Sequence, residues 1–320
     1  MKSLITATLV ALWALAGAHA EDTLIRVGHF PNVTHVQALV AHNLSREGKG
    51  WFEERLGPGV KIDWYTYNAG PSAMEAIFAK SIDLTYVGPS PAINAFARSK
   101  GEEVRIVSGA VDGGAALVIH GDSDIKTGAD FKGKRIATPQ LGNTQDVDCR
   151  AWLKAQGLKI TQLGGDAQVI PTANPDQLPL FASGKLDAVW TVEPWVSRLL
   201  RDAGGKVFHE ETESVTTVLV SSVSFSKENS ALLEKFVKAH RELTDWIKAN
   251  PEEAQRRVVA ELSEEMKSKI SPELIAATWS RIILTNTVNM KSLETYVKNA
   301  KEAGFLRQVP DLQRLVVPVP

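Results

Sequence analysis

The residues best placed to bind a small molecule lie in two stretches that share one pattern. Residues 78–92 predict the end of a helix, a short apolar strand led by Asp83, and a Gly-Pro turn into a new helix that carries Ser90. Residues 181–195 repeat this order, with one residue inserted before Asp187. A helix that begins where a strand ends presents unpaired N–H groups and the positive end of its dipole. Both tips therefore suit a small anion.

Taken singly, each stretch is better interpreted as an ordinary strand-to-helix turn. Their repetition favours two similar α/β lobes whose ligand-binding tips face each other across a cleft. At the second tip, Trp195 either contacts an apolar part of the ligand or covers the core. Glu193 is unexpected beside an anion, and three roles are open to it: bridging the lobes, holding a basic group of the ligand, or bonding to a neighbouring donor.

Polar and aromatic side chains also follow the first predicted strand, at residues 24–28. They are His29, Phe30 and Asn32. Because the carboxyl ends of parallel strands meet at one edge of a sheet, we expect these residues to point toward the same region as Ser90. For His29, a loop histidine bonded to the backbone is an equal alternative.

A second polar segment follows the strand predicted at residues 134–138. Asn143 or Thr144 is placed to cap the next helix, and Thr144 and Gln145 are candidate neutral hydrogen-bond donors to a ligand. The helix dipole favours an acidic residue in the first turn. We therefore expect Asp146 to support the helix rather than to bind a metal ion.

Motifs of the common enzyme classes are absent. The chain has no Gly-x-Ser-x-Gly elbow, no Walker loop, no Gly-x-Gly-x-x-Gly fingerprint and no His-Glu-x-x-His motif. His35 and His42 share the face of a predicted helix, but no carboxylate or cysteine is spaced along the chain to complete a zinc site. Cys149 lies in a predicted helix between charged residues and is expected to be a bystander. We therefore predict no catalytic residue, no metal site and no cofactor.

The order of the predicted elements indicates an α/β fold. Strands and helices alternate, which favours mainly parallel sheets. Gly113 and Gly114 separate two predicted strands, and they mark either a crossing between the lobes or a glycine-rich hairpin turn. Residues 216–221 are expected to carry the chain back to the first lobe, and the rest is mostly helical. We predict one lobe from residues 21–111 and 217–320, and a second lobe from residues 112–216.

The N-terminus predicts export. Lys2, an apolar run over residues 4–15 and the small-x-small sequence at 18–20 are typical of a secretory signal peptide, residues 1–20. The run is too short for a membrane span. With Cys149 as the only cysteine, we expect neither a lipid anchor nor an internal disulfide. A net charge of −1 over 320 residues gives no indication of a surface that binds nucleic acid. Because the N-terminus predicts export, we expect the mature protein to be a free monomer in the periplasm.

Taken in order, these motifs resemble the periplasmic solute-binding proteins of ABC importers in the aliphatic-sulfonate, taurine and nitrate group. The matching segments span nearly the whole mature chain and are residues 28–31, 68–70, 82–92, 133–137, 142–144, 187–188 and 193–195. The resemblance implies a type II-like periplasmic binding protein, in which two α/β lobes are joined by crossing strands and the ligand cleft lies between them. It also implies that His29, Phe30, Ser90, Thr144, Gln145 and Trp195 match ligand-contacting positions. The full set of predicted ligand-binding residues is His29, Phe30, Asn32, Ser90, Gly113, Gly114, Asn143, Thr144, Gln145, Glu193 and Trp195.

We therefore expect a binding protein that captures a small organic anion, above all an aliphatic sulfonate, and delivers it by hinge closure to the permease of an ABC transporter. Nitrate, bicarbonate, taurine and phosphonates are alternatives. A thiamine-precursor pyrimidine is another, either bound or converted by an enzyme of similar fold. The related enzymes rely on a cysteine-rich segment, which a chain with one cysteine lacks. A sensor subunit that presents its ligand to a membrane receptor is a third class.

Overall fold

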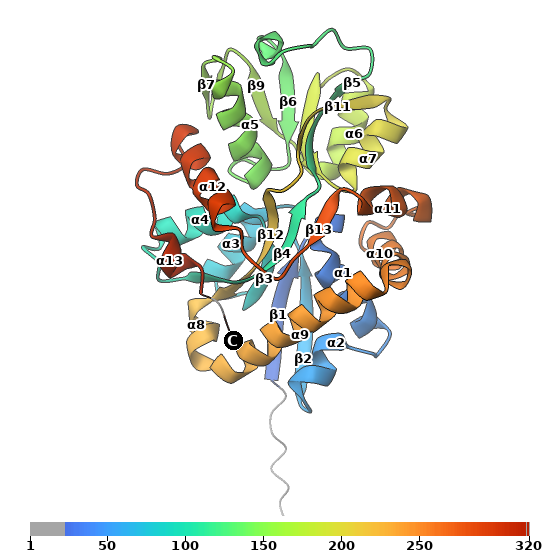
Figure 1. Ribbon diagram of the computed structural model, residues 1–320, viewed down its shortest axis with the longest axis vertical. Helices are drawn as coiled ribbons and strands as arrows, with labels where there is room; N and C mark the ends of the chain where they lie inside the picture. The colour runs from blue at the N-terminus through green and yellow to red at the C-terminus, as the bar shows by residue number, and fades with distance from the viewer. Residues whose placement is uncertain (1–22, 318, 320) are drawn as a thin grey trace, which may run out of the picture.

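The computed structural model describes residues 23–317 and residue 319, so the predicted signal peptide lies outside the described residues. Two mixed β-sheets, each flanked by helices, form two lobes that are stacked end to end in Figure 1. We call the part around the six-stranded sheet lobe 1 and the part around the five-stranded sheet lobe 2. The predicted α/β fold of two lobes is thus confirmed.

Lobe 1 is built on strands whose parallel members end at one edge of the sheet. They are β1 (Thr23–His29), β2 (Val60–Thr66), β3 (Leu84–Val87), β4 (Val104–Gly113), β12 (Val215–Ser222) and β13 (Ile282–Leu284), in the order β13-β4-β12-β3-β1-β2. β1 is parallel to β2 and to β3, whereas β12 is antiparallel to β3 and β4. The residues that follow β1, β2 and β3 therefore lie at the same edge.

Helices cover both faces of this sheet. One face packs against α1 (Val36–Arg46), α2 (Trp51–Leu56), α8 (Val223–Glu228), α9 (Ser230–Ala249), α10 (Pro251–Glu265) and α11 (Pro272–Trp279). The other face packs against α3 (Gly70–Phe78), α4 (Pro89–Arg98), α12 (Met290–Glu302) and α13 (Leu312–Leu315). Strand β12 contributes side chains to the cores on both faces of the sheet. Leu219 packs with the helices of the first face, and Val218 and Val220 pack with those of the second. In the described part of the chain, none of the helices has the length and apolar composition that a bilayer span requires.

Lobe 2 repeats this arrangement on a smaller scale. Its sheet holds β5 (Ala115–His120), β6 (Arg135–Thr138), β9 (Gln168–Pro171), β10 (Ala188–Val192) and β11 (Gly205–Glu211), in the order β11-β5-β10-β6-β9. Around it lie α5 (Thr144–Ala155), α6 (Asn174–Ala182), α7 (Trp195–Asp202), the 3-10 turn η2 (Gly128–Phe131) and a separate pair, β7 (Ile160–Thr161) and β8 (Gly164–Gly165). β6 is parallel to both β9 and β10, so the residues after these strands also share one edge.

The repeated aspartate of the two sequence units performs the same task in each lobe. The carboxylate of Asp83 accepts hydrogen bonds from the backbone N–H of Arg26 (2.9 Å) and from its guanidinium (2.7 Å). Asp187 accepts the corresponding pair from Arg135, at 2.8 and 3.1 Å. Each aspartate therefore fixes the strand that it leads beside the first parallel strand of its lobe.

The glycine pair carries the chain from one lobe to the other. Gly113 ends β4 in the first sheet, and β5 begins one residue after Gly114 in the second sheet. Their φ angles are +72° and +75°, in the left-handed region that favours glycine. A Cβ atom on Gly113 would lie 2.7 Å from the carbonyl oxygen of Arg281, so no side chain fits there. The hairpin alternative is wrong, because β4 and β5 belong to different sheets.

The chain returns to lobe 1 between β11 and β12. Strand β12 contains residues 216–221, the segment predicted to carry the chain back. Figure 1 shows the two connections running side by side between the lobes. The limits proposed from the sequence, residues 21–111 with 217–320 and residues 112–216, stay a prediction.

A buried polar chain ties the centre of lobe 1 together. The hydroxyl of Tyr86 lies 2.9 Å from Nδ1 of His240, and Nε2 of His240 lies 2.9 Å from the carbonyl oxygen of Gly109. Because a carbonyl only accepts, His240 Nε2 carries the proton and Nδ1 accepts from Tyr86. Burial lowers the pKa of His240 to about 4, so the ring is neutral at neutral pH. This chain joins β3, α9 and β4.

Replacing Tyr86 with Phe removes one link of this chain and leaves His240 Nδ1 buried without a donor. We expect Tyr86→Phe to lower the free energy of unfolding by about 1–3 kcal/mol, measured by urea denaturation at pH 7. The control is Tyr65→Phe, because the Tyr65 hydroxyl bonds to Asp63 at the surface (2.8 Å). Its effect should stay within about 0.5 kcal/mol. Equal losses in the two variants would contradict the assignment.

Candidate functional site

A narrow cavity with an empty volume of about 350 Å³ lies between the lobes. Lobe 1 contributes Phe30, Asn32, Thr34, His35, Asn68, Ala69, Gly70, Gly88, Pro91 and Thr216, and lobe 2 contributes Pro139, Asn143, Thr144, Gln145, Asn174 and Val192. These residues follow the parallel strands of both sheets, as the expected geometry of α/β lobes requires. That volume includes space open to solvent; the part that admits the centre of a water-sized sphere is about 20 Å³, room for about one water molecule.

Four helices begin at this cavity. Gly70 opens α3, Gly88 caps α4, Asn143 caps α5 and Asn174 opens α6, and all four line the cavity. Two of these helices belong to each lobe. Their positive dipole ends therefore converge on one space, together with the first-turn N–H groups of the residues that are not proline. Among the described residues that line the cavity there is no Asp, Glu, Lys or Arg.

His35 is the titratable lining residue, and it is neutral. It is buried, and burial lowers its pKa well below the usual range. The backbone N–H of Phe30 donates to His35 Nδ1 at 3.4 Å, so the remaining proton of the neutral ring is on Nε2. The rings of Phe30 and His35 pack together with centroids 4.3 Å apart. His35 therefore brings a hydrogen-bond donor to the cavity wall without a charge.

Five of the predicted residues line the cavity, namely Phe30, Asn32, Asn143, Thr144 and Gln145. Ser90 lies directly behind the wall in the first turn of α4, and its backbone N–H donates to Thr144 Oγ1 at 3.3 Å. The two residues come from different lobes. The hydroxyl of Ser90 is buried and has no hydrogen-bond partner among the described residues.

Asn32 joins the lobes at one end of the cavity. Its Oδ1 accepts a hydrogen bond from Trp195 Nε1 at 2.9 Å, and Asn174 Nδ2 lies 3.5 Å away. Trp195 does not line the cavity; it is buried and packs with Ala115 and Val192. Its placement matches the alternative in which it covers the core.

Glu193 lies outside the cavity and forms part of the contact between the lobes. Its carbonyl oxygen accepts from the N–H of Val33 at 2.9 Å, and its carboxylate lies 3.3 Å from Nε of Arg281 in lobe 1. Ser197 donates to the same carboxylate through its hydroxyl (2.9 Å) and its N–H (3.1 Å). Burial raises the pKa of Glu193, while the bonds from Ser197 and the charge of Arg281 oppose that shift. Of the three roles left open, bridging the lobes and bonding to neighbouring donors describe these contacts.

His29 does not face the cavity, so that expectation is wrong. Successive side chains of a strand point to opposite faces, and His29 continues the face of Ile25 and Val27, which are buried against α1 and α10. Gly113 and Gly114 do not line the cavity either.

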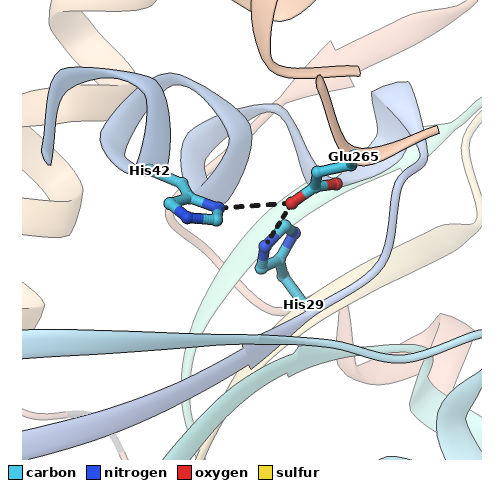
Figure 2. Close-up of side chains that lie close together, drawn as sticks. All are labelled: His29, His42 and Glu265. Carbon is cyan, nitrogen blue, oxygen red and sulfur yellow. Dashed lines mark hydrogen bonds and ion pairs between the residues drawn. The ribbon is translucent and has the colours of Figure 1, made fainter. Parts of the chain in front are cut away.

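On its own face, His29 meets His42 and Glu265 from distant parts of the chain (Figure 2). The spacing of residues along the chain indicates no carboxylate that could complete a zinc site with a histidine pair. The fold nevertheless places the carboxylate of Glu265 beside His29 and His42.

The other eleven lining residues are not among the predicted ligand-binding residues. The polar ones are Thr34, His35, Asn68, Asn174 and Thr216. His35 was grouped with His42 from helical spacing, and Asn174 precedes a proline at a helix start, which is the available sequence signal. Thr216 reaches the cavity because the returning strand β12 passes between the lobes.

Comparison with known proteins identifies the family. A family model described as the NMT1-like family matches residues 18–263. The chain belongs to the NMT1-like family.

This NMT1-like protein is similar to binding proteins named for sulfonates. It is 26% identical over 243 residues to a putative aliphatic sulfonates-binding protein of Escherichia coli (strain K12), covering 73% of this chain and 71% of that one. It is 27% identical over 247 residues to a protein of the same name from Bacillus subtilis (strain 168), covering 75% and 70%.

The fold matches a solved structure, the alkanesulfonate-binding protein SsuA of Xanthomonas axonopodis pv. citri bound to MOPS. The TM-score is 0.75 at 20% identity, over 93% of this chain and 99% of the other. The resemblance stated from the motifs is confirmed.

The cavity wall of this NMT1-like protein depends on a buried ion pair in α5. The carboxylate of Asp146 accepts from Thr138 Oγ1 and from the N–H of Gly142, both at 2.9 Å, and from two nitrogens of Arg150, both at 3.0 Å. Asp146 is fully buried. It fastens the loop that carries Pro139 and Asn143 to the helix start, as its predicted supporting role requires.

Replacing Arg150 with Met leaves the carboxylate of Asp146 buried without a counter-charge. We expect Arg150→Met to lower the free energy of unfolding by about 3–5 kcal/mol. Arg135→Met is the matched control, because the Arg135–Asp187 pair of the same lobe is partly exposed to solvent. Its loss should be about 1 kcal/mol or less. Similar unfolding midpoints in urea for the two variants would contradict the role of Asp146.

Proposed function

We propose that this protein is the ligand-binding component of an ABC importer and captures an aliphatic sulfonate in the periplasm. The observation that carries the proposal is the convergence of four helix N-termini on a cavity without charged side chains. Such a site holds an anion through N–H donors and helix dipoles instead of a counter-ion. The similarity to sulfonate-binding relatives supports the same ligand class.

The lining residues favour a sulfonate over taurine and over a phosphonate dianion. A sulfonate carries one negative charge and three acceptor oxygens, which suit the N–H groups of the helix starts and the donors Thr144, Gln145 and His35. Its alkyl part would lie against Phe30 and Val192. Taurine adds an ammonium group, for which the described wall has no carboxylate. A phosphonate dianion would place a second charge in a cavity with no counter-charge.

Binding would use the two connections between the lobes as a hinge. In the structure, the lobes already meet through the Asn32–Trp195 hydrogen bond and through a bond of 2.9 Å between Asn299 and Asp148. A ligand held by helix starts of both lobes favours this closed arrangement. The surface formed on closure would be the one that the permease reads. An enzyme for thiamine precursors is disfavoured, since Cys149 is buried in the core of lobe 2, away from the cavity.

The first test is a thermal-shift screen of the mature chain with alkanesulfonates, taurine, nitrate, bicarbonate, a phosphonate and thiamine-precursor pyrimidines. We expect alkanesulfonates to raise the melting temperature by several degrees, because a ligand at 100 times its Kd adds about 2.7 kcal/mol to the stability of the folded state. A shift with a pyrimidine alone, or with no sulfonate, would overturn the ligand assignment.

The second test locates the site. We expect Ser90→Ala combined with Thr144→Ala to weaken sulfonate binding about 10- to 100-fold, because each loses a hydroxyl near the anion, worth about 1–1.5 kcal/mol. Isothermal calorimetry measures the affinity. The matched control is Ser99→Ala with Thr295→Ala, two hydroxyls outside the cavity lining that bond to nearby backbone carbonyls. Unchanged affinity in the double variant would remove the cavity from the proposal.

A further inference from the structure

We propose that His29, His42 and Glu265 form a binding site for a divalent transition-metal ion, with zinc as the ion of best fit. The site lies in lobe 1, on the opposite side of the cleft wall from the ligand cavity, and does not depend on the proposed ligand. Figure 2 shows the three side chains directed at one another from β1, α1 and the end of α10.

The donor atoms have the spacing that a small cation requires. One ligand atom from each residue lies within 4.8 Å of the others. Glu265 Oε1 is 2.9 Å from His29 Nε2 and 3.2 Å from His42 Nδ1. Ligand atoms of a tetrahedral zinc site are about 3.3 Å apart, given Zn–N and Zn–O bonds of about 2.0–2.1 Å. Small side-chain movements would therefore complete the geometry. Two imidazoles and a carboxylate are a donor set that zinc prefers over magnesium or calcium.

Surrounding contacts orient these ligands as they do in metal sites. The second ring nitrogen of His29, Nδ1, lies 3.4 Å from the carbonyl oxygen of Phe30. A proton on Nδ1 leaves a lone pair on Nε2, the atom beside Glu265. Thr66 Oγ1 donates to Glu265 Oε1 at 3.2 Å. The indole of Trp64 stacks on His42 with centroids 5.3 Å apart and meets the His29 ring edge-on at 5.6 Å.

The charge and the unpaired atoms of the cluster also favour a cation. Glu265 Oε2 and the Oε2 atom of the neighbouring Glu261 are buried without a hydrogen-bond partner among the described residues. Glu261 Oε1 lies 2.8 Å from His42 Nδ1 and accepts from Arg46 Nε at 3.0 Å. Two carboxylates thus face one guanidinium. Buried polar atoms normally have partners, and a metal ion would supply one.

Glu265 is the last residue of α10, where the negative end of the helix dipole adds to the attraction for a cation. Glu261 lies one turn earlier on the same helix, and its contact of 2.8 Å with His42 Nδ1 would be replaced by the bond from that nitrogen to the metal ion. His42 and Glu265 are 223 residues apart in sequence. A bound ion would therefore fasten α10 to α1 and to the end of β1.

The test strips the untagged mature chain of metal with a chelator, reloads it with zinc, and removes unbound zinc by dialysis against metal-free buffer. We expect one tightly held zinc per chain by mass spectrometric metal analysis. We also expect a rise in melting temperature with zinc but not with magnesium. Cobalt in place of zinc should give the visible absorption bands of a four-coordinate site. The alternative, in which the cluster is an ion pair only, predicts neither bound metal nor cobalt bands.

The variants separate these outcomes. Glu265→Gln and His42→Gln should weaken zinc binding by about tenfold or more. Glu264→Gln is the matched control, because Glu264 is the exposed neighbour of Glu265 and pairs with Lys267; its zinc affinity should equal that of the wild type. Circular dichroism establishes that each variant is folded, and two independent ligand variants guard against loss of fold in one. Equal zinc affinity in the wild type, Glu265→Gln and His42→Gln would overturn the proposal.

Discussion

A helix that follows a parallel strand begins at the carboxyl edge of the sheet, and this constraint shapes the whole molecule. Four such helix starts, two from each lobe, meet in one cavity. The fold thereby supplies a positive potential without placing a charged side chain in the wall. An ion held in this way keeps its own charge, and the protein does not bury a lysine or arginine to match it. The proposed anionic ligand follows from this arrangement, in which helix dipoles replace a buried cationic side chain.

A buried ion pair holds the wall in place, because Asp146 and Arg150 fasten the loop before α5. The Arg26–Asp83 and Arg135–Asp187 pairs, which are partly exposed, fix central strands of the two lobes. The contacts between the lobes are of a different kind. They include single hydrogen bonds, such as the one from Trp195 to Asn32, and the ion pair between Arg281 and Glu193. Rigid lobes joined by two chain connections are suited to hinge motion.

Strand β1 serves two sites with two successive residues. Phe30 follows the strand and lines the ligand cavity, whereas His29 points into the opposite side and joins His42 and Glu265. The backbone of one short loop therefore links the cavity to the cluster. A metal ion at the cluster would make that loop more rigid.

The sequence by itself determined the features that arise from neighbouring residues. The Asp-led strands, the helix starts at Ser90 and Thr144 and the order of motifs all depend on local preferences, and these predicted the fold and five of the cavity residues. The sequence could not determine which face His29 occupies, because a shift of one residue in a strand reverses every side chain. Nor could it bring Glu265 to His42, or Trp195 to Asn32. Those contacts join segments far apart in the chain, and only the packing of α10 on α1 and of one lobe on the other decided them.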